Sequence, residues 1–143
     1  LAAYTYFQEV DTPENQAFVK RFQEKFGADA PYLNELATRS YEGIMLWAEA
    51  VRKAETAERM AVIEALESGI GLAGPSGAIT LDPKTHHGVL NVYLAELKDQ
   101  SFNIVETHAA QPPSDTLLVC DLQANPDQAV FYFENGLEAA GIR

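Results

Sequence analysis

The hydrophobic residues of this chain change their spacing at the glycine-rich stretch "GIGLAGPSGA", residues 69–78. Before it, apolar side chains recur every three to four residues, which is typical of amphipathic helices. After it, short β-prone runs such as "GAITLD", "VLNVYLAEL" and "FNIVETH" alternate with turns. Helices between a leading strand and a trailing β-meander predict an α/β fold, in which the strands need not all belong to one sheet.

Three helices are predicted, and each has recognisable ends. Thr12 caps the first, Pro13 takes its first helical position, and Gly27 ends it. The second runs from about Asn34 to Ala54, and the third from Thr56 to a stop at Gly69. The expected buried faces are Phe18, Val19, Phe22 and Phe26 in the first helix; Ala37, Tyr41, Ile44, Ala48 and Val51 in the second, widened by Met45, Leu46 and Trp47; and Met60, Ile63 and Leu66 in the third.

The two ends of the chain have different compositions. "AAYTYFQEV" is aromatic and β-prone, which predicts a strand or an extended segment that crosses between structural units. Near the other end, "QPPSD" is a predicted linker and "TLLVCDL" another possible strand. Asn125 is expected to cap a last helix, with an apolar stripe of Val130, Phe133, Leu137 and Ala140. A start at Leu1 without methionine predicts a processed product or an excised segment.

Composition excludes several classes of partner. The 143 residues, 47% of them hydrophobic, suit one globular domain with a real core. A net charge of -11 makes nucleic acid and anionic membrane surfaces poor partners. No apolar run approaches the length of a membrane span. Because Cys120 is the one cysteine, an intrachain disulfide is impossible and a cysteine metal site is excluded.

Two motifs suggest a ligand but have simpler interpretations. "GIGLAG" matches a dinucleotide fingerprint, yet it follows a helix and leads into a strand, the reverse of the order that pyrophosphate binding needs. His86 and His87 are neighbours, so on an extended segment their side chains point to opposite faces and cannot easily hold one ion. We expect a turn here, with one ring hydrogen-bonded to the backbone.

No catalytic constellation stands out, so the chain is predicted not to be an enzyme. Ser76 lacks the second glycine of a nucleophile elbow, and Cys120 lies in an apolar run. Trp47 and Tyr41 fit the core better than a ligand platform. The aromatic residues near the N-terminus, Tyr4, Tyr6 and Phe7, fit two interpretations: core packing, or the lining of a pocket for a small ligand.

Three stretches occur in a characteristic order: "YFQEVDTPENQAFVKRF", "YEGIMLWAEAVRKAET" and "PSGAITLDPKTHHGVLNVYLAELKDQSFNIV". As an ordered set they resemble the C-terminal part of type I periplasmic solute-binding proteins, closest to the branch of urea and short-chain amide receptors. The resemblance covers about residues 1–110, and the tail from Pro112 departs from the transporter pattern. The matching residues are Tyr6, Phe7, Asp11, Thr12, Pro13, Tyr41, Trp47, Ala48, Glu49, Ala50, Pro75, Ser76, Gly77, Asp82, His86, His87 and Glu96.

The resemblance implies that this α/β chain is the C-terminal portion of a two-lobed fold much longer than itself. Residues 1–10 would be a crossing strand and 11–73 the helical part of one lobe. Residues 74–110 would hold the third crossing and the β-ribbon of the other lobe, and 111–143 a tail with a C-terminal helix. His86 and His87 would then be structural. Only the crossing strand is placed to reach the cleft, so Tyr4, Tyr6 and Gln8 are the expected solute-binding residues.

The implied function is non-enzymatic binding of a small polar solute, of amide, urea or amino-acid type, for an ABC importer, without metal or cofactor. Ligand would shift the population from open to closed lobes. The partner would be the transporter permease, and the location periplasmic or extracytoplasmic. The alternative is a cytoplasmic amide sensor that acts on a regulatory protein. The wide apolar surface of the second helix predicts self-association of the chain on its own.

Overall fold

The computed structural model describes residues 1–113 and 120–127. The predicted strand "TLLVCDL" falls largely on residues 114–119, and the predicted last helix largely on residues 128–143, so most of each lies outside the described residues. Cys120 to Leu122, at the end of that strand, are not in a strand. The elements are β1 (Ala2–Tyr4), α1 (Pro13–Phe26), α2 (Glu35–Ala54), α3 (Arg59–Glu67), β2 (Gly71–Gly74), β3 (Gly77–Leu81), β4 (Gly88–Lys98) and β5 (Ser101–Gln111).

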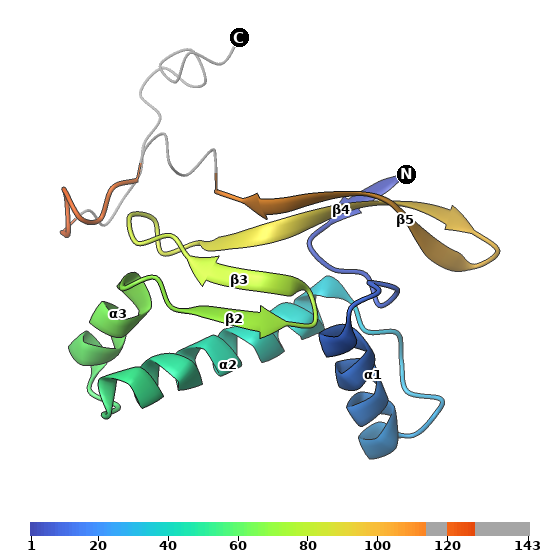
Figure 1. Cartoon of the computed structure of the whole chain (residues 1–143), viewed down its shortest axis with the longest axis horizontal. Coiled ribbons are helices and arrows are strands. Elements are labelled where there is room, and N and C mark those ends of the chain that lie inside the picture. The colour runs from blue at the N-terminus through green and yellow to red at the C-terminus, as the bar shows by residue number, and fades with distance from the viewer. Residues whose placement is uncertain (114–119, 128–143) are drawn as a thin grey trace, which may run out of the picture.

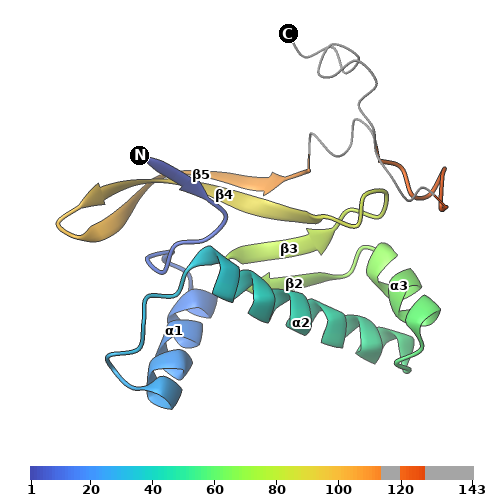
Figure 2. The ribbon, with the colours of Figure 1, turned by 180° about the vertical axis from the view of Figure 1, so that it is seen from behind.

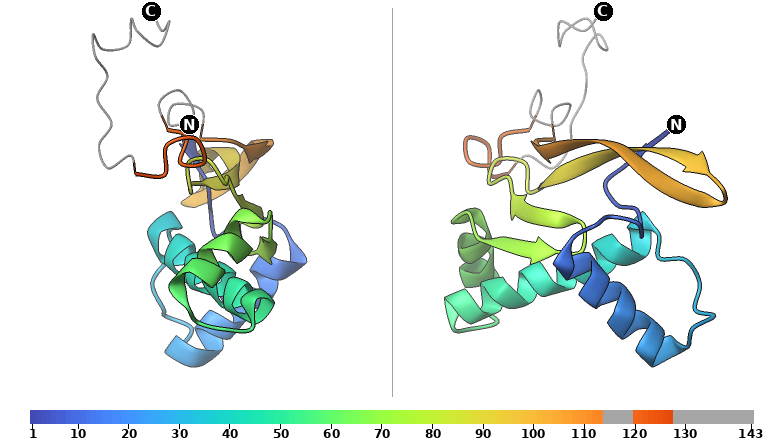
Figure 3. Two further views of the ribbon diagram at one scale, coloured as in Figure 1. Left: turned by 90° about the vertical axis from the view of Figure 1, so that its left-hand side faces the viewer. Right: turned by 45° about the vertical axis from the view of Figure 1, so that its right-hand side comes forward.

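The described strands form one antiparallel sheet beside the three helices, so the predicted α/β class is confirmed. Its order is β1-β4-β3-β2, and β5 also pairs with β4. In Figure 1 the helices lie on one side, the β4–β5 ribbon and β1 on the other, and β2 and β3 between them. Seen from behind, α2 runs along β2 (Figure 2), and the ribbon twists as it extends past the helices (Figure 3). The three helices therefore form one body, and β1, β4 and β5 form a second body. Strands β2 and β3 lie between the two.

The predicted helix ends are largely confirmed. The Thr12 hydroxyl accepts a hydrogen bond from the backbone N–H of Asn15, with Pro13 opening the helix, and Gly27 ends it at a φ of 96°. The Asn34 side chain caps α2 through the backbone N–H of Ala37. Polar side chains at these positions satisfy backbone donors that a helix leaves unpaired, which is why the ends can be predicted from sequence.

The predicted buried face of α2 is partly correct: Leu46 is buried, and Tyr41 and Val51 pack against the core clusters. The buried side chains are Thr38, Glu42, Leu46 and Ala50, a row spaced by four, whereas Ile44 and Trp47 are exposed. Thr38 and Glu42, both polar, were not among the residues predicted to be buried. Both are buried because they meet the segments that cross between the two bodies.

Helix α3 differs in the same way. It begins at Arg59, not near Thr56, because the Glu58 carboxylate accepts from the backbone N–H groups of Met60 and Ala61 and caps the helix there. Val62 and Ala65 are buried, and Met60, predicted to point inward, is exposed. In α1, Phe18 is buried as predicted and Val19 and Phe22 pack beside it, but Phe26 is exposed.

The glycine-rich stretch forms a hairpin. Gly69, at a φ of 80°, follows α3 as predicted, but Gly71–Gly74 form β2 instead of an irregular turn. The β4–β5 ribbon was predicted correctly. Its turn places Asp99 and Gln100 at φ values of 51° and 64°, the two positive values that a tight hairpin turn requires.

Separate apolar clusters stabilise the two bodies. Phe7, Val10, Tyr93 and Ala95 form one against the sheet, and Tyr6, Phe18 and Leu33 form another between α1 and α2. A third joins α2 to α3. None of the described helices is both long and apolar enough to span a bilayer.

Candidate functional site

The crossing segment, residues 5–10, joins the two bodies. It leaves β1, makes a turn in which the Val10 N–H bonds the Phe7 carbonyl at 3.1 Å, and enters α1. Successive side chains point to opposite bodies: Tyr6 packs against Phe18 in the helical body, and Phe7 packs against Tyr93 in the sheet. The segment therefore anchors both cores.

Asn15 of α1 fixes the shape of this crossing. Its side chain is buried, and its Nδ2 donates to the carbonyls of Gln8 at 2.9 Å and Val10 at 2.7 Å. Its Oδ1 accepts from the Tyr6 hydroxyl at 2.9 Å. Burial raises the pKa of Tyr6 to about 12, although the Thr38 hydroxyl opposes the shift. Tyr6 is therefore a neutral donor at physiological pH.

Glu9 and Tyr32 tie the crossing to the loop before α2 and to the ribbon. The Tyr32 hydroxyl donates to Glu9 Oε2 at 2.6 Å and accepts from the Gln8 N–H at 3.0 Å. Glu9 Oε1 accepts from the N–H of Phe102 at 3.2 Å, at the start of β5. Burial, followed by the hydrogen bond to Glu9, raises the pKa of the Tyr32 hydroxyl above its usual range.

An aromatic pocket of about 320 Å³ opens beside the crossing. Its walls come from the crossing, the start of α2, the loop before it and the tip of β5. Phe7 and Phe102 lie with ring centroids 4.9 Å apart, and Tyr32 lies 6.3 Å from Phe102. Apolar walls with a few polar groups suit a small organic ligand. The lining residues are Tyr4, Tyr6, Phe7, Tyr32, Asn34, Glu35, Leu36 and Phe102.

The three predicted solute-binding residues have different surroundings. Tyr4 is half exposed and lines the aromatic pocket. Tyr6 lines the same pocket, but it is almost fully buried and its hydroxyl is bonded to Asn15. Gln8 does not line the pocket: its Oε1 accepts from the Leu33 N–H at 2.8 Å and holds the loop before α2. The structure thus brings two of the three residues together.

A second hollow of about 490 Å³ lies on the other side of the crossing and is more polar. Glu9 to Thr12 form one wall, and the ribbon forms the opposite wall. Asn103, at its edge, has its amide bonded to Glu96 at 3.2 Å. This hollow is the structural alternative to the aromatic pocket as a place for solute.

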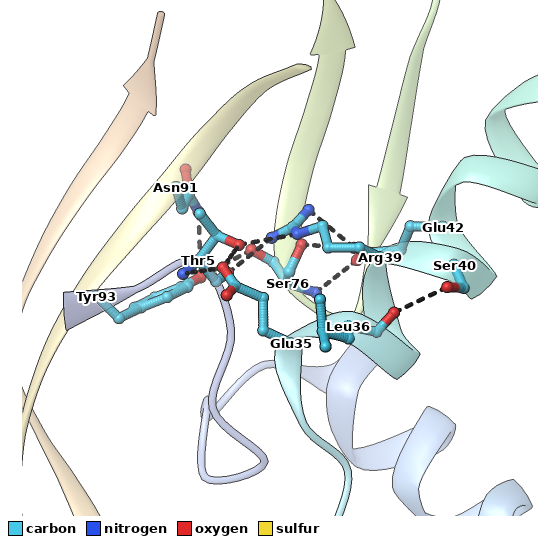
Figure 4. A network of polar contacts seen from close by, with 9 residues as sticks. All are labelled: Thr5, Glu35, Leu36, Arg39, Ser40, Glu42, Ser76, Asn91 and Tyr93. Carbon is cyan, nitrogen blue, oxygen red and sulfur yellow. Dashed lines mark hydrogen bonds and ion pairs between the residues drawn. The ribbon is translucent and has the colours of Figure 1, made fainter. Parts of the chain in front are cut away.

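A polar network, buried around Ser76 and partly buried around Arg39, lies between the two bodies (Figure 4). Arg39 of α2 donates from Nε to the Thr5 hydroxyl at 2.9 Å and from Nη2 to the Thr5 carbonyl at 2.7 Å. Glu35, one turn earlier, accepts from the Thr5 N–H at 2.9 Å and also from its hydroxyl. Burial lowers the pKa of Arg39, and the charge of Glu42 opposes this shift. Glu35 and Arg39 of α2 thus hold the crossing segment from the helical side.

Glu42 continues the network to the turn between β2 and β3. Only 1% of this carboxylate residue is exposed. It accepts from Arg39 Nη1 at 2.9 Å and from the N–H and hydroxyl of Ser76 at 2.8 and 3.0 Å. From the sheet side, the Tyr93 hydroxyl donates to the Ser76 carbonyl at 3.0 Å. Sequence reasoning missed Arg39 and Glu42, although the position of Glu42 in the row of Leu46 and Ala50 is a usable signal.

The histidine pair forms part of a turn. Asp82 accepts from the Thr85 N–H and hydroxyl at 2.9 Å each, and the His86 N–H bonds the Asp82 carbonyl at 2.8 Å. The His87 ring bonds the Thr85 carbonyl at 2.9 Å, as predicted, and the His86 ring reaches Glu67 of α3 at 2.7 Å. Within residues 1–113 and 120–127, no three His, Cys, Asp or Glu side chains converge as metal ligands.

The described part of the tail packs on this turn. Lys84 pairs with Asp121 at 2.9 Å, and its carbonyl accepts from the Leu122 N–H at 2.8 Å. The hydrogen bond from Lys84 lowers the pKa of the Asp121 carboxyl. Cys120 is buried beside the same carbonyl, with its Sγ at 3.7 Å, in keeping with the predicted role of a small apolar side chain.

A family model and solved structures indicate the same family for this chain. The profile described as "Periplasmic binding protein domain" matches residues 1–117. A solute-binding protein of an ABC transporter from Rhodopseudomonas palustris HaA2, solved with p-hydroxybenzoic acid, is 28% identical with a TM-score of 0.66, over 78% of this chain and 31% of that chain. One from R. palustris BisB5, solved with 3,4-dihydroxybenzoic acid, is 26% identical with a TM-score of 0.68, over 79% of this chain and 32% of that chain.

A further solved structure and a curated protein are also similar. A leucine-binding protein from Thermotoga maritima is 21% identical with a TM-score of 0.61, over 79% of this chain and 31% of that chain, and supports the fold alone. A Geobacillus stearothermophilus protein named limonene hydroxylase is 28% identical over 127 residues, which are 87% of this chain and 23% of that protein. The chain spans about a third of the solved relatives and about a quarter of the curated one.

Proposed function

Since this chain belongs to the periplasmic binding protein family, we propose that it is the C-terminal part of a non-enzymatic receptor that delivers a small solute to an ABC importer. The observation that carries the proposal is the crossing segment. It joins two bodies with separate cores and has an aromatic pocket beside it. Two bodies joined by narrow connections can close on a ligand when the closed arrangement makes contacts that the open one lacks.

The pocket supports a small planar solute with one polar group. Four aromatic side chains of the lining offer ring faces: Tyr4, Phe7, Tyr32 and Phe102. Its polar residues, Asn34 and Glu35, lie at the N-terminal end of α2. Two of the solved relatives hold hydroxylated benzoic acids, which agrees with such a lining. The sequence motifs resemble those of urea and amide receptors. We therefore propose a small carboxylic acid or amide as the solute and Tyr4 as its contact in this chain.

A titration of the complete receptor tests this function. The probes are benzoate, 4-hydroxybenzoate, leucine, acetamide and urea, measured by calorimetry. We expect one class to bind, and Tyr4→Ala to weaken it about tenfold, or about 1.4 kcal/mol, because an exposed ring wall is lost. Since Tyr4 is half exposed, the melting temperature should change little.

Asn103→Ala is the matched control, because it changes the polar hollow and leaves the aromatic pocket intact. If Asn103→Ala weakens binding and Tyr4→Ala does not, solute occupies the other side of the crossing. Binding of none of the probes would contradict the proposed solute class.

The importer requires the receptor to act outside the cytoplasm, beside the permease. A cytoplasmic amide sensor that acts on a regulatory protein is the second candidate. The residues after 117 favour it, because they extend past the family match and include the aromatic-rich "DQAVFYFENG". Cell fractionation separates the two: the importer receptor is released with the periplasm, and the sensor remains with the cytoplasm.

The isolated chain is expected to self-associate. Leu36, Ile44 and Trp47 lie along one side of α2 and are 77%, 66% and 51% exposed. Exposed apolar side chains gathered on one side of a helix favour association with a second copy. Light scattering behind a sizing column should give a mass above 15.7 kDa, and Ile44→Glu with Trp47→Glu should restore the monomer. A sharp 15.7 kDa peak for the unmodified chain would contradict this prediction.

A further inference from the structure

The polar network of Figure 4 lies between α2 on one side and the crossing segment and the β2–β3 turn on the other. The apolar cluster of the helices is separate from that of the sheet. Of two adjacent residues in the crossing segment, Tyr6 belongs to the helical cluster and Phe7 to the cluster on the sheet. Between them, side chains of α2 bond two segments at once, the crossing segment and the β2–β3 turn. Arg39 holds the crossing segment through Thr5, and Glu42 holds the β2–β3 turn through Ser76.

The fit of the β2–β3 turn on Glu42 leaves little freedom. A Cβ on Gly74 would lie 2.4 Å from Glu42 Oε1, so the backbone is seated directly on the carboxylate. On the other side of the turn, a Cβ on Gly77 would lie 2.3 Å from the Asn91 amide of β4. The turn is therefore held between a helix of one body and a strand of the other.

The bonds of this network are directional and mostly charge-assisted. Arg39 is a planar fork whose bonds to Thr5 and to Glu42 require a fixed orientation. Buried networks of this type have few alternative arrangements, since every broken bond leaves a buried charged or polar group unpaired. Such a network sets an angle between two bodies more sharply than apolar packing does.

We propose that Arg39 and Glu42 form a hinge clamp, a pair of positioning residues that fixes the angle between the helical body and the sheet by bonding the crossing segment and the β2–β3 turn to α2. Only the purpose of the clamp rests on the proposed function: it would set the angle between the lobes before they close. Its existence depends on this chain alone, and it is testable without any solute.

The test measures the distance between the bodies in the whole chain. Spin labels are placed at Glu64→Cys on α3 and Val105→Cys on β5, both exposed, with Cys120→Ala removing the native thiol. Glu42→Gln keeps an acceptor for the Ser76 N–H but presents an amide N–H to Arg39. The ion pair that links Arg39, and with it the crossing segment, to the β2–β3 turn is then lost. We expect the distance distribution from double electron–electron resonance to broaden by about twofold, because the angle is no longer fixed.

Glu49→Gln is the matched control, because Glu49 and Arg52 form an ion pair of the same spacing on the exposed part of α2. It should leave the distribution unchanged. A Glu42→Gln distribution as narrow as that of the control overturns the clamp, whatever the melting temperatures. If Glu42→Gln fails to fold by circular dichroism, Arg39→Lys takes its place, because an ammonium cannot bond Thr5 and Glu42 as the fork does. Failure of both variants to fold would make the network a folding determinant and would also overturn the proposal.

Discussion

Gly74→Ala is expected to lower the free energy of unfolding by about 2–3 kcal/mol, as overpacking of a rigid buried site does. The added Cβ would lie 2.4 Å from Glu42 Oε1, 3.0 Å from its Cδ and 3.1 Å from its Cγ. Glu42 cannot move aside cheaply, because it is buried and bonded to Arg39 and Ser76. Either the turn or the carboxylate has to shift, and hydrogen bonds between the two bodies are then lost.

Urea unfolding measures this effect, and the neighbour of Glu42 supplies the control. Gly43 lies in α2 with nothing within 4 Å of an added Cβ, so Gly43→Ala should stabilise the chain by about 0.5–1 kcal/mol through helix propensity. Opposite signs for the two glycines are the expected result. Equal, small effects would show that the β2–β3 turn does not rest on Glu42.

Asn15→Leu is expected to destabilise the chain by about 3 kcal/mol. The leucine fills a similar volume but leaves the Gln8 carbonyl and the Tyr6 hydroxyl without the Asn15 side chain as a partner. It also removes one of the two hydrogen bonds to the Val10 carbonyl, which keeps the bond from the Thr12 N–H. Each buried polar group without a partner costs about 1–3 kcal/mol. Gln16→Ala is the control on the same helix, because its amide bonds Asp11 at the surface, and it should change stability by less than about 0.5 kcal/mol.

A double-mutant cycle isolates the bond between Asn15 and Tyr6. Tyr6→Phe removes the hydroxyl, and in the Asn15→Leu background its effect should shrink by about 1 kcal/mol, the size of one buried hydrogen bond. Strict additivity in urea unfolding would contradict the bond. Because the pKa of Tyr6 is raised to about 12, the cycle can be measured at neutral pH without ionisation of the hydroxyl.

Local chemistry explains which parts of the fold were predictable. Thr12, Pro13, Gly27 and Asn34 act on their own backbone neighbours, so the ends of α1 and the start of α2 follow from a few residues of sequence. The β4–β5 ribbon follows from its alternation and its turn. The buried face of α2 depends instead on what packs against it, and the partners of Glu42 and Arg39 are 34 residues distant in sequence.

The candidate site divides in the same way. Tyr4 and Tyr6 could be selected as aromatic residues in a segment expected to cross between units, and both line the pocket. Gln8 was selected from the same segment, but its neighbour in space is Leu33, which brings its side chain to the loop before α2. Asn15 carries no local signal, because a helical asparagine is ordinarily exposed, and only the fold shows that it is buried.

The sheet also constrains the order in which the chain acquires structure during synthesis. β1 pairs with β4 by matching Ala2 with Ala95, and Glu9 meets Phe102, which is 93 residues later. At about 5–20 residues per second, roughly 5–20 s pass between the ribosome's addition of Glu9 and of its partner. The helices can pair within that time, since their contacts are nearer in sequence. β1 is therefore made long before β4, and until β4 is made the edge of β1 remains open to any other strand.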